Sequence, residues 1–280
     1  MGLYSPKEIA ANYINIGKAK AAQSIGKLLV LGILAGAFIA LAGVGANTAS
    51  STASGSVARL LSGIVFPTGL VMVLLAGSEL FTGNNLMIIP LLEKEIRFAA
   101  MMRNWLFVYI GNLIGSLLVA LIAFYGQQLA LFDGGLALTT IKVAANKVNY
   151  SFDKAFLLAV GCNFLVCIAV WCSFAAQSVS GKVLGAYLPI MLFVLAGFEH
   201  SVANMYFIPA GILALTDPAY AVAAGGAGIN TAHLTWGGFL LRNLLPVTLG
   251  NIVGGSFLVG LPYWYVYLKR DKSKATHPAG

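Results

Sequence analysis

Long uncharged stretches, separated by short charged segments, make up most of the chain. Four of them, at roughly residues 28–47, 104–127, 155–176 and 243–267, reach the length of about 20 apolar residues that a helix needs to cross a bilayer. Two others, 60–92 and 183–216, are each interrupted near the middle by one acid, Glu79 and Glu199. As a straight helix either would measure about 50 Å, against a hydrocarbon core of about 30 Å. The pattern predicts six membrane-spanning helices, of which the second and fifth are broken at the acid.

Short motifs recur at matching places in the two halves. Asn85-x4-Pro90 and Asn204-x4-Pro209 follow the two predicted breaks, and Gly-Asn-x-x-Gly occurs at 111–115 in the third span and at 250–254 in the sixth. An odd number of spans per repeat places the two halves in opposite orientations. We therefore predict an all-α, aquaporin-like 3+3 inverted repeat, in which the broken helices meet near the membrane midplane and mark a translocation path.

Composition supports a membrane protein and excludes several function classes. Hydrophobic residues make up 59% of the chain, charged residues 9%, and the mean hydropathy is +0.86, whereas a soluble domain has about a quarter charged residues. A soluble enzyme, a nucleic-acid reader and a secreted disulfide scaffold are excluded. Three cysteines at five-residue spacing share no helix face, and no phosphate loop or dinucleotide fingerprint is found, so we expect no metal and no cofactor.

The distribution of basic residues predicts the orientation. Most of the 17 Lys and Arg residues fall on the side of both termini, which the positive-inside rule places in the cytoplasm of a multi-pass plasma-membrane protein. Ser5, Pro6 and Glu8 predict a capping box that starts a short helix. We expect a cytoplasmic amphipathic helix over 1–26 that packs on the protein rather than gates it, a six-helix transmembrane domain over 27–270, and a short cytoplasmic tail over 271–280.

Four stretches of the sequence resemble the formate/nitrite transporter family. They are Ser-Glu-Leu-Phe-Thr-Gly-Asn at 78–84, Gly-Phe-Glu-His-Ser-Val-Ala-Asn-Met at 197–205, Asn163 in the fourth span, and Gly-Asn-Ile-Val-Gly-Gly at 250–255. The resemblance extends from Pro6 to about Lys269. It implies a homopentamer whose protomers each have a pore for small monovalent anions: formate, nitrite or hydrosulfide. Glu79 does not choose among them, and the overall sequence looks nearer to the hydrosulfide subgroup.

The resemblance also implies roles for individual residues. The pore histidine corresponds to His200, its neighbouring glutamate to Glu199, and the pore-facing threonine of the first break to Thr82. The cytoplasmic hydrophobic constriction corresponds to Leu70, with Phe66 one turn earlier, and the periplasmic constriction to Phe193. The remaining matches are a supporting asparagine at Asn163 and a basic residue that draws anions toward the pore at Lys147.

The chemistry of these residues fits an anion path. His200 is the only histidine inside a predicted span, and imidazole changes charge near neutral pH. It would stabilise an anion by charge or hydrogen bonding, or give it a proton. Glu79 and Glu199 repel anions, so we expect both to turn away from the lumen and accept hydrogen bonds, with Asn163, Asn204 and Ser201 as candidate donors near Glu199.

The helices that restart at about Asn84 and Asn204 would direct their N-terminal ends, which carry partial positive charge, into the centre of the pore.

Several alternative functions remain open at this stage. A proton-coupled formate or nitrite transporter is the main one. An intramembrane enzyme would use Glu199 and His200 as an acid–base pair, but no partner nucleophile stands in the recognised loops, and we predict no enzyme activity. The Asn-Pro-Ala boxes of a water pore are missing, and a single pore histidine disfavours ammonium. The expected partners are a small monovalent anion, the lipid bilayer and further copies of the chain, with no nucleic acid.

Overall fold

The computed structural model describes residues 2–269, so the predicted tail at 271–280 lies outside the described residues. Within them the chain is helical, apart from one isolated bridge between Leu3 and Ala176. Six helices are long and apolar enough to cross a membrane. They are Ile25–Ser50, Gly55–Ala76, Phe98–Tyr125, Phe152–Ala175, Val179–Ala196 and Gly238–Tyr267. The predicted all-α architecture with six spans is confirmed.

The elements of the first half are α1 (Pro6–Ala22), α2 (Ile25–Ser50), α3 (Gly55–Val65), α4 (Thr68–Ala76), η1 (Gly83–Met87), α5 (Ile88–Leu92) and α6 (Phe98–Tyr125). A connection of η2 (Gln128–Ala130) and α7 (Gly135–Val148) leads to the second half. Its elements are α8 (Phe152–Ala175), α9 (Val179–Ala196), α10 (Ser201–Ala214), α11 (Pro218–Gly226), η3 (Gly238–Leu244), α12 (Leu245–Ile252), η4 (Val253–Gly260) and α13 (Leu261–Tyr267).

Both predicted breaks are present and both begin at a glycine. α4 ends before Gly77, with φ of 77°, and α9 ends before Gly197, with φ of 72°. This left-handed conformation stops a helix and is strained for residues with a Cβ. The helices restart at Gly83 and Ser201, slightly earlier than the asparagines that the sequence suggested. Asn84 and Asn204 lie inside the first turns of the restarted helices. From there their side chains reach the glutamates of the breaks.

The third and sixth spans begin earlier than predicted, at Phe98 and Gly238 rather than 104 and 243. The predicted spans started directly after the charged residues Arg103 and Arg242, but both arginines lie within the helices. Arg103 Nη2 donates to the carbonyl of Ala21 at 2.6 Å, and Arg242 Nε donates to that of Val148 at 3.1 Å. An arginine near a helix end that reaches exposed carbonyls is tolerated there, so charge alone did not set the boundary.

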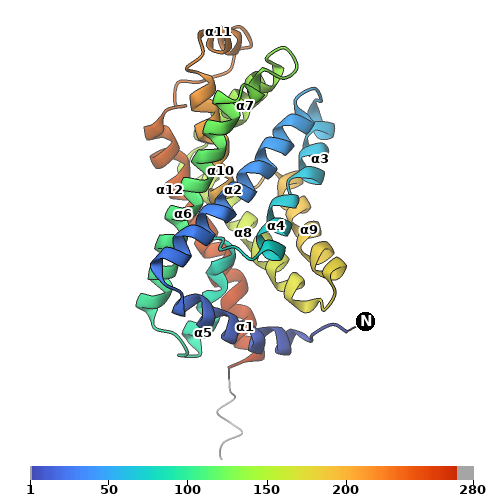
Figure 1. The fold of residues 1–280 in the computed structure, drawn as a ribbon, viewed down its shortest axis with the longest axis vertical. Helices are drawn as coiled ribbons and strands as arrows, with labels where there is room; N and C mark the ends of the chain where they lie inside the picture. The colour runs from blue at the N-terminus through green and yellow to red at the C-terminus, as the bar shows by residue number, and fades with distance from the viewer. Residues whose placement is uncertain (1, 270–280) are drawn as a thin grey trace, which may run out of the picture.

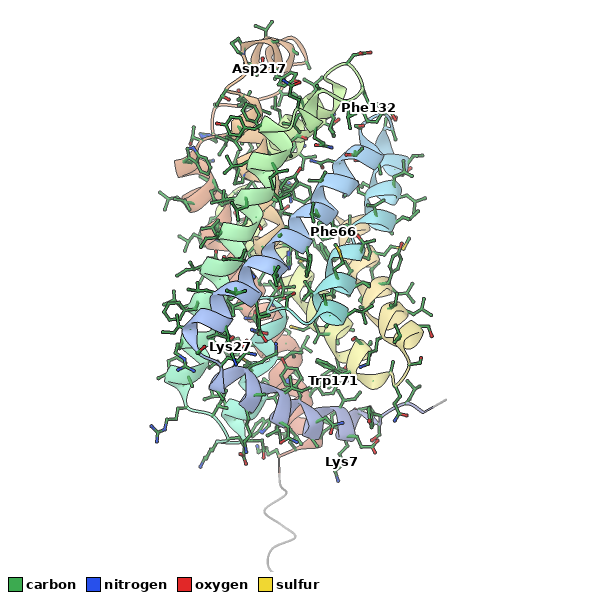
Figure 2. All side chains as sticks on the ribbon, in the orientation of Figure 1. Lys7, Lys27, Phe66, Phe132, Trp171 and Asp217 are labelled. Carbon is green, nitrogen blue, oxygen red and sulfur yellow. The ribbon has the colours of Figure 1, made fainter. Side chains whose placement is uncertain are left out.

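Helix α1 lies across one end of the bundle, where α13 also ends, and α11 lies at the opposite end (Figure 1). Lys7 and Lys27 mark the α1 end in Figure 2, and Asp217 marks the other. The capping box is formed, because Glu8 accepts from the Ser5 backbone at 2.7 Å while Ser5 Oγ accepts from the Glu8 backbone at 3.3 Å. Hydrogen bonds from the Ser5 backbone and hydroxyl hold the pKa of Glu8 below its usual value. Which end faces the cytoplasm stays a prediction.

Glycines at four-residue spacing let the spans approach closely. A Cβ on Gly115 in α6 would collide with the carbonyl of Ile33 in α2, and a Cβ on Gly36 would collide with that of Asn112. Gly250 and Gly254 face the carbonyls of Phe156 and Val160 in the same way. The backbones of α2 and α6, and of α8 and α12–η4, are therefore held in contact.

We expect Gly115→Ala to lower the stability of the purified protein by about 1–3 kcal/mol, because backbone must move to admit the methyl group. Thermal unfolding in detergent measures the loss. Gly26→Ala in α2 is the control, since nothing lies within 4 Å of its added Cβ. Equal melting temperatures for both variants would contradict the close packing of α2 on α6.

Candidate functional site

Two buried side chains, one from each break, meet inside the bundle. Thr82 ends the first break and is 0% exposed, and His200 ends the second and is 3% exposed. Thr82 Oγ1 lies 2.9 Å from His200 Nε2. The structure therefore joins residues that are 118 positions apart in the chain at one point.

The two ring nitrogens of His200 have different partners. Nδ1 accepts a hydrogen bond from the Ala203 backbone N–H at 3.0 Å, so it carries no proton. The proton of the ring is then on Nε2, which donates to Thr82 Oγ1. The bond to Ala203 also caps the N-terminus of α10. In this arrangement His200 is a neutral hydrogen-bond donor.

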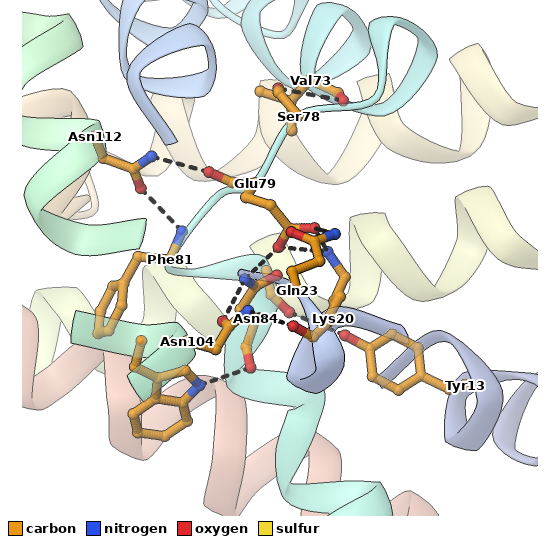
Figure 3. Close-up of polar contacts among 12 residues, drawn as sticks. Tyr13, Lys20, Gln23, Val73, Ser78, Glu79, Phe81, Asn84, Asn104 and Asn112 are labelled. Atoms are coloured by element: carbon orange, nitrogen blue, oxygen red, sulfur yellow. Dashed lines mark hydrogen bonds and ion pairs between the residues drawn. The ribbon is translucent and has the colours of Figure 1, made fainter. Parts of the chain in front are cut away.

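A cluster of polar residues surrounds Glu79 at the first break (Figure 3). Lys20 Nζ from α1 lies 2.8 Å from each carboxylate oxygen of Glu79. Asn84 Nδ2 donates to Glu79 Oε2 at 2.6 Å and to Asn104 Oδ1 at 2.8 Å. The carboxylate is therefore paired and hydrogen-bonded although its residue is only 4% exposed.

Asn112 holds the unwound backbone of the first break. Its Nδ2 donates to the carbonyl of Glu79 at 2.9 Å, and its Oδ1 accepts from the Phe81 N–H at 2.9 Å (Figure 3). The same Nδ2 donates to the carbonyl of Gly32 at 2.8 Å. The Glu79 carbonyl and the Phe81 N–H lie in the unwound segment, where they have no helical partner, and leaving them unpaired in a buried site is costly. One amide side chain thus replaces the backbone ladder that the break removed.

The second break has the same set of contacts. Glu199 accepts from Lys147 Nζ at 2.8 Å, from Asn204 Nδ2 at 2.7 Å and from Asn243 Nδ2 at 3.2 Å. Asn251 donates to the carbonyls of Ala159 and Glu199 and accepts from the Ser201 N–H. An inverted repeat would produce this correspondence, and we interpret the contacts in that way.

Two of the three donors expected beside Glu199, namely Asn163 and Ser201, do not contact it. Asn163 Nδ2 donates to Thr82 O, Asn85 Oδ1 and Asn251 O instead, so it joins the first break to Asn251, the residue that holds the second break. Ser201 Oγ has no hydrogen-bond partner among the described residues. Only Asn204 contacts Glu199 as expected. The sequence analysis did not identify Lys20 as the partner of Glu79 or Asn243 as a partner of Glu199. Lys20 counted there only as a basic residue of the terminal side.

Lys147 differs from its sequence-based interpretation. The family resemblance implied a basic residue that draws anions toward the pore, whereas the side chain of Lys147 is 14% exposed and forms an ion pair with Glu199 at 2.8 Å. Its Nζ also lies 5.4 Å from the ring centroid of Phe207. The charge of Lys147 is thus balanced by a carboxylate within direct contact, and its long-range field is weak.

Apolar side chains enclose a small chamber next to His200. It has a volume of about 10 Å³, the size of about one water molecule, and is lined by Leu70, Phe66, Phe193, Ile39, Leu80, Val166, Ile190 and His200. Phe66 and Phe193 pack edge to face with ring centroids 5.7 Å apart. The predicted constriction residues therefore lie together around the histidine.

A larger cavity of about 730 Å³, which we call the vestibule, lies beyond Phe66 and Phe193. Both aromatic rings line the vestibule as well as the chamber, whereas Leu70 lines only the chamber. Phe66 thus stands with Phe193 in the barrier between the two spaces, and it also lines the chamber together with Leu70. The position of Phe66 in this barrier follows from the direction of its ring, which packs against Phe193 across the bundle. Polar residues that line the vestibule include Asn47, Ser50, Arg59, Lys142, Asn146 and Tyr150.

Comparison with known proteins gives a family and close relatives. The model of a family described as Formate/nitrite transporter matches residues 7–265. The chain is 42% identical to a Bacillus subtilis protein named Uncharacterized transporter YrhG, over 98% of this chain and 97% of that one. It is 38% identical to Formate channel FocA of Escherichia coli, over 96% of each. A solved structure titled Pentameric formate channel with formate bound matches with a TM-score of 0.78 and 37% identity, covering 88% of this chain and 98% of that one.

Proposed function

This chain belongs to the formate/nitrite transporter family, and from that premise we propose that it conducts small monovalent anions, formate and nitrite foremost, through a pore in each protomer. The chain is a multi-pass membrane protein. The proposed path runs from the vestibule, between Phe66 and Phe193, past His200 and Thr82, and on beyond Leu70. The observation that carries the proposal is the Thr82–His200 pair beside an otherwise apolar chamber.

The chamber supports passage of a small, dehydrated anion. Its volume of about 10 Å³ admits few atoms at a time, and its apolar collars resist a hydrated ion. A bare charge in the membrane costs several kcal/mol. The N–H of His200 Nε2 and the hydroxyl of Thr82 are the polar groups that offset this cost, and the N-terminus of α10 adds partial positive charge.

The hydrogen bonds of His200 favour conduction over obligatory proton transfer. For the ring to pass its Nε2 proton to an anion as an acid, Nδ1 must first become protonated, and that breaks the bond from Ala203 that caps α10. We therefore propose His200 as a donor that is shared between Thr82 and the passing anion. Proton-coupled transport of formate or nitrite is the alternative, and it requires this cap to open.

The remaining assignments follow from the family. Relatives are named as channels and transporters, so we propose no catalysed reaction. We also propose a homopentamer in the plasma membrane with both termini in the cytoplasm, as the pentameric relative and the basic α1 end suggest. Relatives whose names give a substrate are named for formate, or for formate and nitrite, so hydrosulfide is the secondary candidate, contrary to the preference drawn from the sequence.

Anion flux into proteoliposomes tests the function. We expect uptake of formate and nitrite well above that of protein-free liposomes, with the anion recovered chemically unchanged. Hydrosulfide is measured alongside, and stopped-flow light scattering gives the rates. Flux indistinguishable from protein-free liposomes for all three anions would refute the proposal, and chemical conversion of the anion would favour an enzyme.

A further inference from the structure

We propose that Arg59 forms an anion-binding subsite in the vestibule, and that this subsite prefers planar anions with two oxygen atoms to anions with a single acceptor atom. The inference deepens the proposed function, on which it rests, because it says which side chain first holds the anion and which anions it favours. Formate and nitrite belong to the preferred class. Hydrosulfide and chloride belong to the other.

The charges of the vestibule point to Arg59. Three basic residues, Arg59, Lys142 and Lys147, line this cavity together with the acid Glu199. Glu199 is engaged with Lys147 at 2.8 Å. Within residues 2–269, no carboxylate oxygen lies within 4.0 Å of the side-chain nitrogens of Arg59 or Lys142. The net positive charge of the vestibule therefore resides on Arg59 and Lys142.

Arg59 lies against the second break. It lies in the first turns of α3, and its Nη1 donates to the carbonyl of Leu195, near the C-terminus of α9, at 3.5 Å. Its guanidinium covers Gly197, because a Cβ on that residue would collide with Nη1. Gly197 is three positions before His200 in the chain. The guanidinium thus sits where the vestibule meets the segment that carries the pore histidine.

The guanidinium of Arg59 has N–H donors that form no hydrogen bond with the described residues. Nε and Nη2 of Arg59 make no hydrogen bond with any described residue, and the residue is exposed to the vestibule. An arginine presents its N–H groups as a planar fork that matches two oxygens of one carboxylate. Lys142, also exposed, offers a point charge with no such geometry. The two cations therefore differ in what they select, although both attract anions.

The substitution Arg59→Lys keeps the positive charge and removes the planar fork of N–H groups, so it tests the fork alone. In proteoliposomes, we expect Arg59→Lys to raise the formate concentration that gives half-maximal flux about three- to ten-fold, the loss that corresponds to one strong hydrogen bond of a bidentate pair. Lys142→Gln is the matched control, because it removes a charge from the same cavity. We expect a shift of less than about two-fold for it, and this shift should vanish at high salt. Arg59 is exposed, so its variants should melt close to the wild type.

Competition tests the preference. Hydrosulfide, chloride and nitrite are each added as competitors of formate uptake. In Arg59→Lys we expect hydrosulfide and chloride to inhibit nearly as well as in the wild type. Nitrite should inhibit less well, in parallel with the lower affinity for formate. An unchanged half-maximal formate concentration in Arg59→Lys would overturn the subsite. A shift no larger than that of Lys142→Gln would do so as well, and equal loss of potency for all competitors would overturn the preference. Failure of the wild type to conduct any of formate, nitrite and hydrosulfide would instead refute the proposed function.

Discussion

Replacing Lys147 with alanine is expected to destabilise the protein by about 3–5 kcal/mol, because it leaves the carboxylate of Glu199 buried without its cation. The side chain of Glu199 is only 3% exposed, and Lys147 Nζ lies 2.8 Å from it. The amides of Asn204 and Asn243 remain as donors but carry no charge. Thermal unfolding of the detergent-solubilised protein measures the effect, and Glu199→Gln in the same background should recover much of the loss.

An exposed ion pair provides the matched control. Lys18 and Glu95 lie 2.6 Å apart with side chains that are 49% and 44% exposed, and such a pair contributes about 0–1 kcal/mol. Lys18→Ala should therefore melt close to the wild type. If Lys147→Ala also melts like the wild type, water from the vestibule solvates Glu199, and the buried ion pair does not stabilise the second break.

Replacing His200 with phenylalanine is expected to abolish anion flux. The chamber of about 10 Å³ is otherwise lined by aliphatic and aromatic side chains, so the variant removes the imidazole donor and fills the space that an anion needs. It also removes the side chain that caps α10. An anion then faces an apolar barrier with several kcal/mol of uncompensated charge. Liposome flux measures the loss, and the melting temperature shows whether the variant is folded.

His200→Asn separates the chemistry of the histidine from its capping role. Asparagine is among the best helix caps, so α10 should stay in place, but the side chain cannot titrate. We expect wild-type flux to change with pH once protonation of Nδ1 breaks the cap on α10, and this variant to conduct anions without that change. Flux measured against pH for both proteins decides the matter. Superimposable curves would mean that His200 is structural and that backbone dipoles stabilise the anion.

Features that depend on neighbouring residues followed from the sequence alone. The number of spans follows from the length of uncharged stretches, since each bilayer crossing requires about 20 apolar residues. The two breaks follow from Gly77 and Gly197, because each stands two positions before an acid within a stretch too long for one helix. The capping box at Ser5 and Glu8 is local as well.

Only the tertiary structure decided which groups neutralise the two acids. Lys20 and Glu79 are 59 positions apart, and Lys147 and Glu199 are 52 apart. No periodicity relates such pairs, and basic residues near the ends of spans are predicted equally well as solvated loop charges. Burial makes pairing obligatory, but the partner is whichever donor the packing of α1 or α7 brings within reach.

The place of Phe66 was decided in the same way. A one-turn offset from Leu70 predicts a shared helix face, yet Phe66 packs on Phe193 of α9 and Phe207 of α10, at the border of the vestibule. Sequence spacing reports direction around one helix axis, while the height of a ring along the path depends on the side chains it meets from other helices. The sequence therefore determined the helices and their breaks, and the packing between helices determined which residues neutralise, cap and close the path.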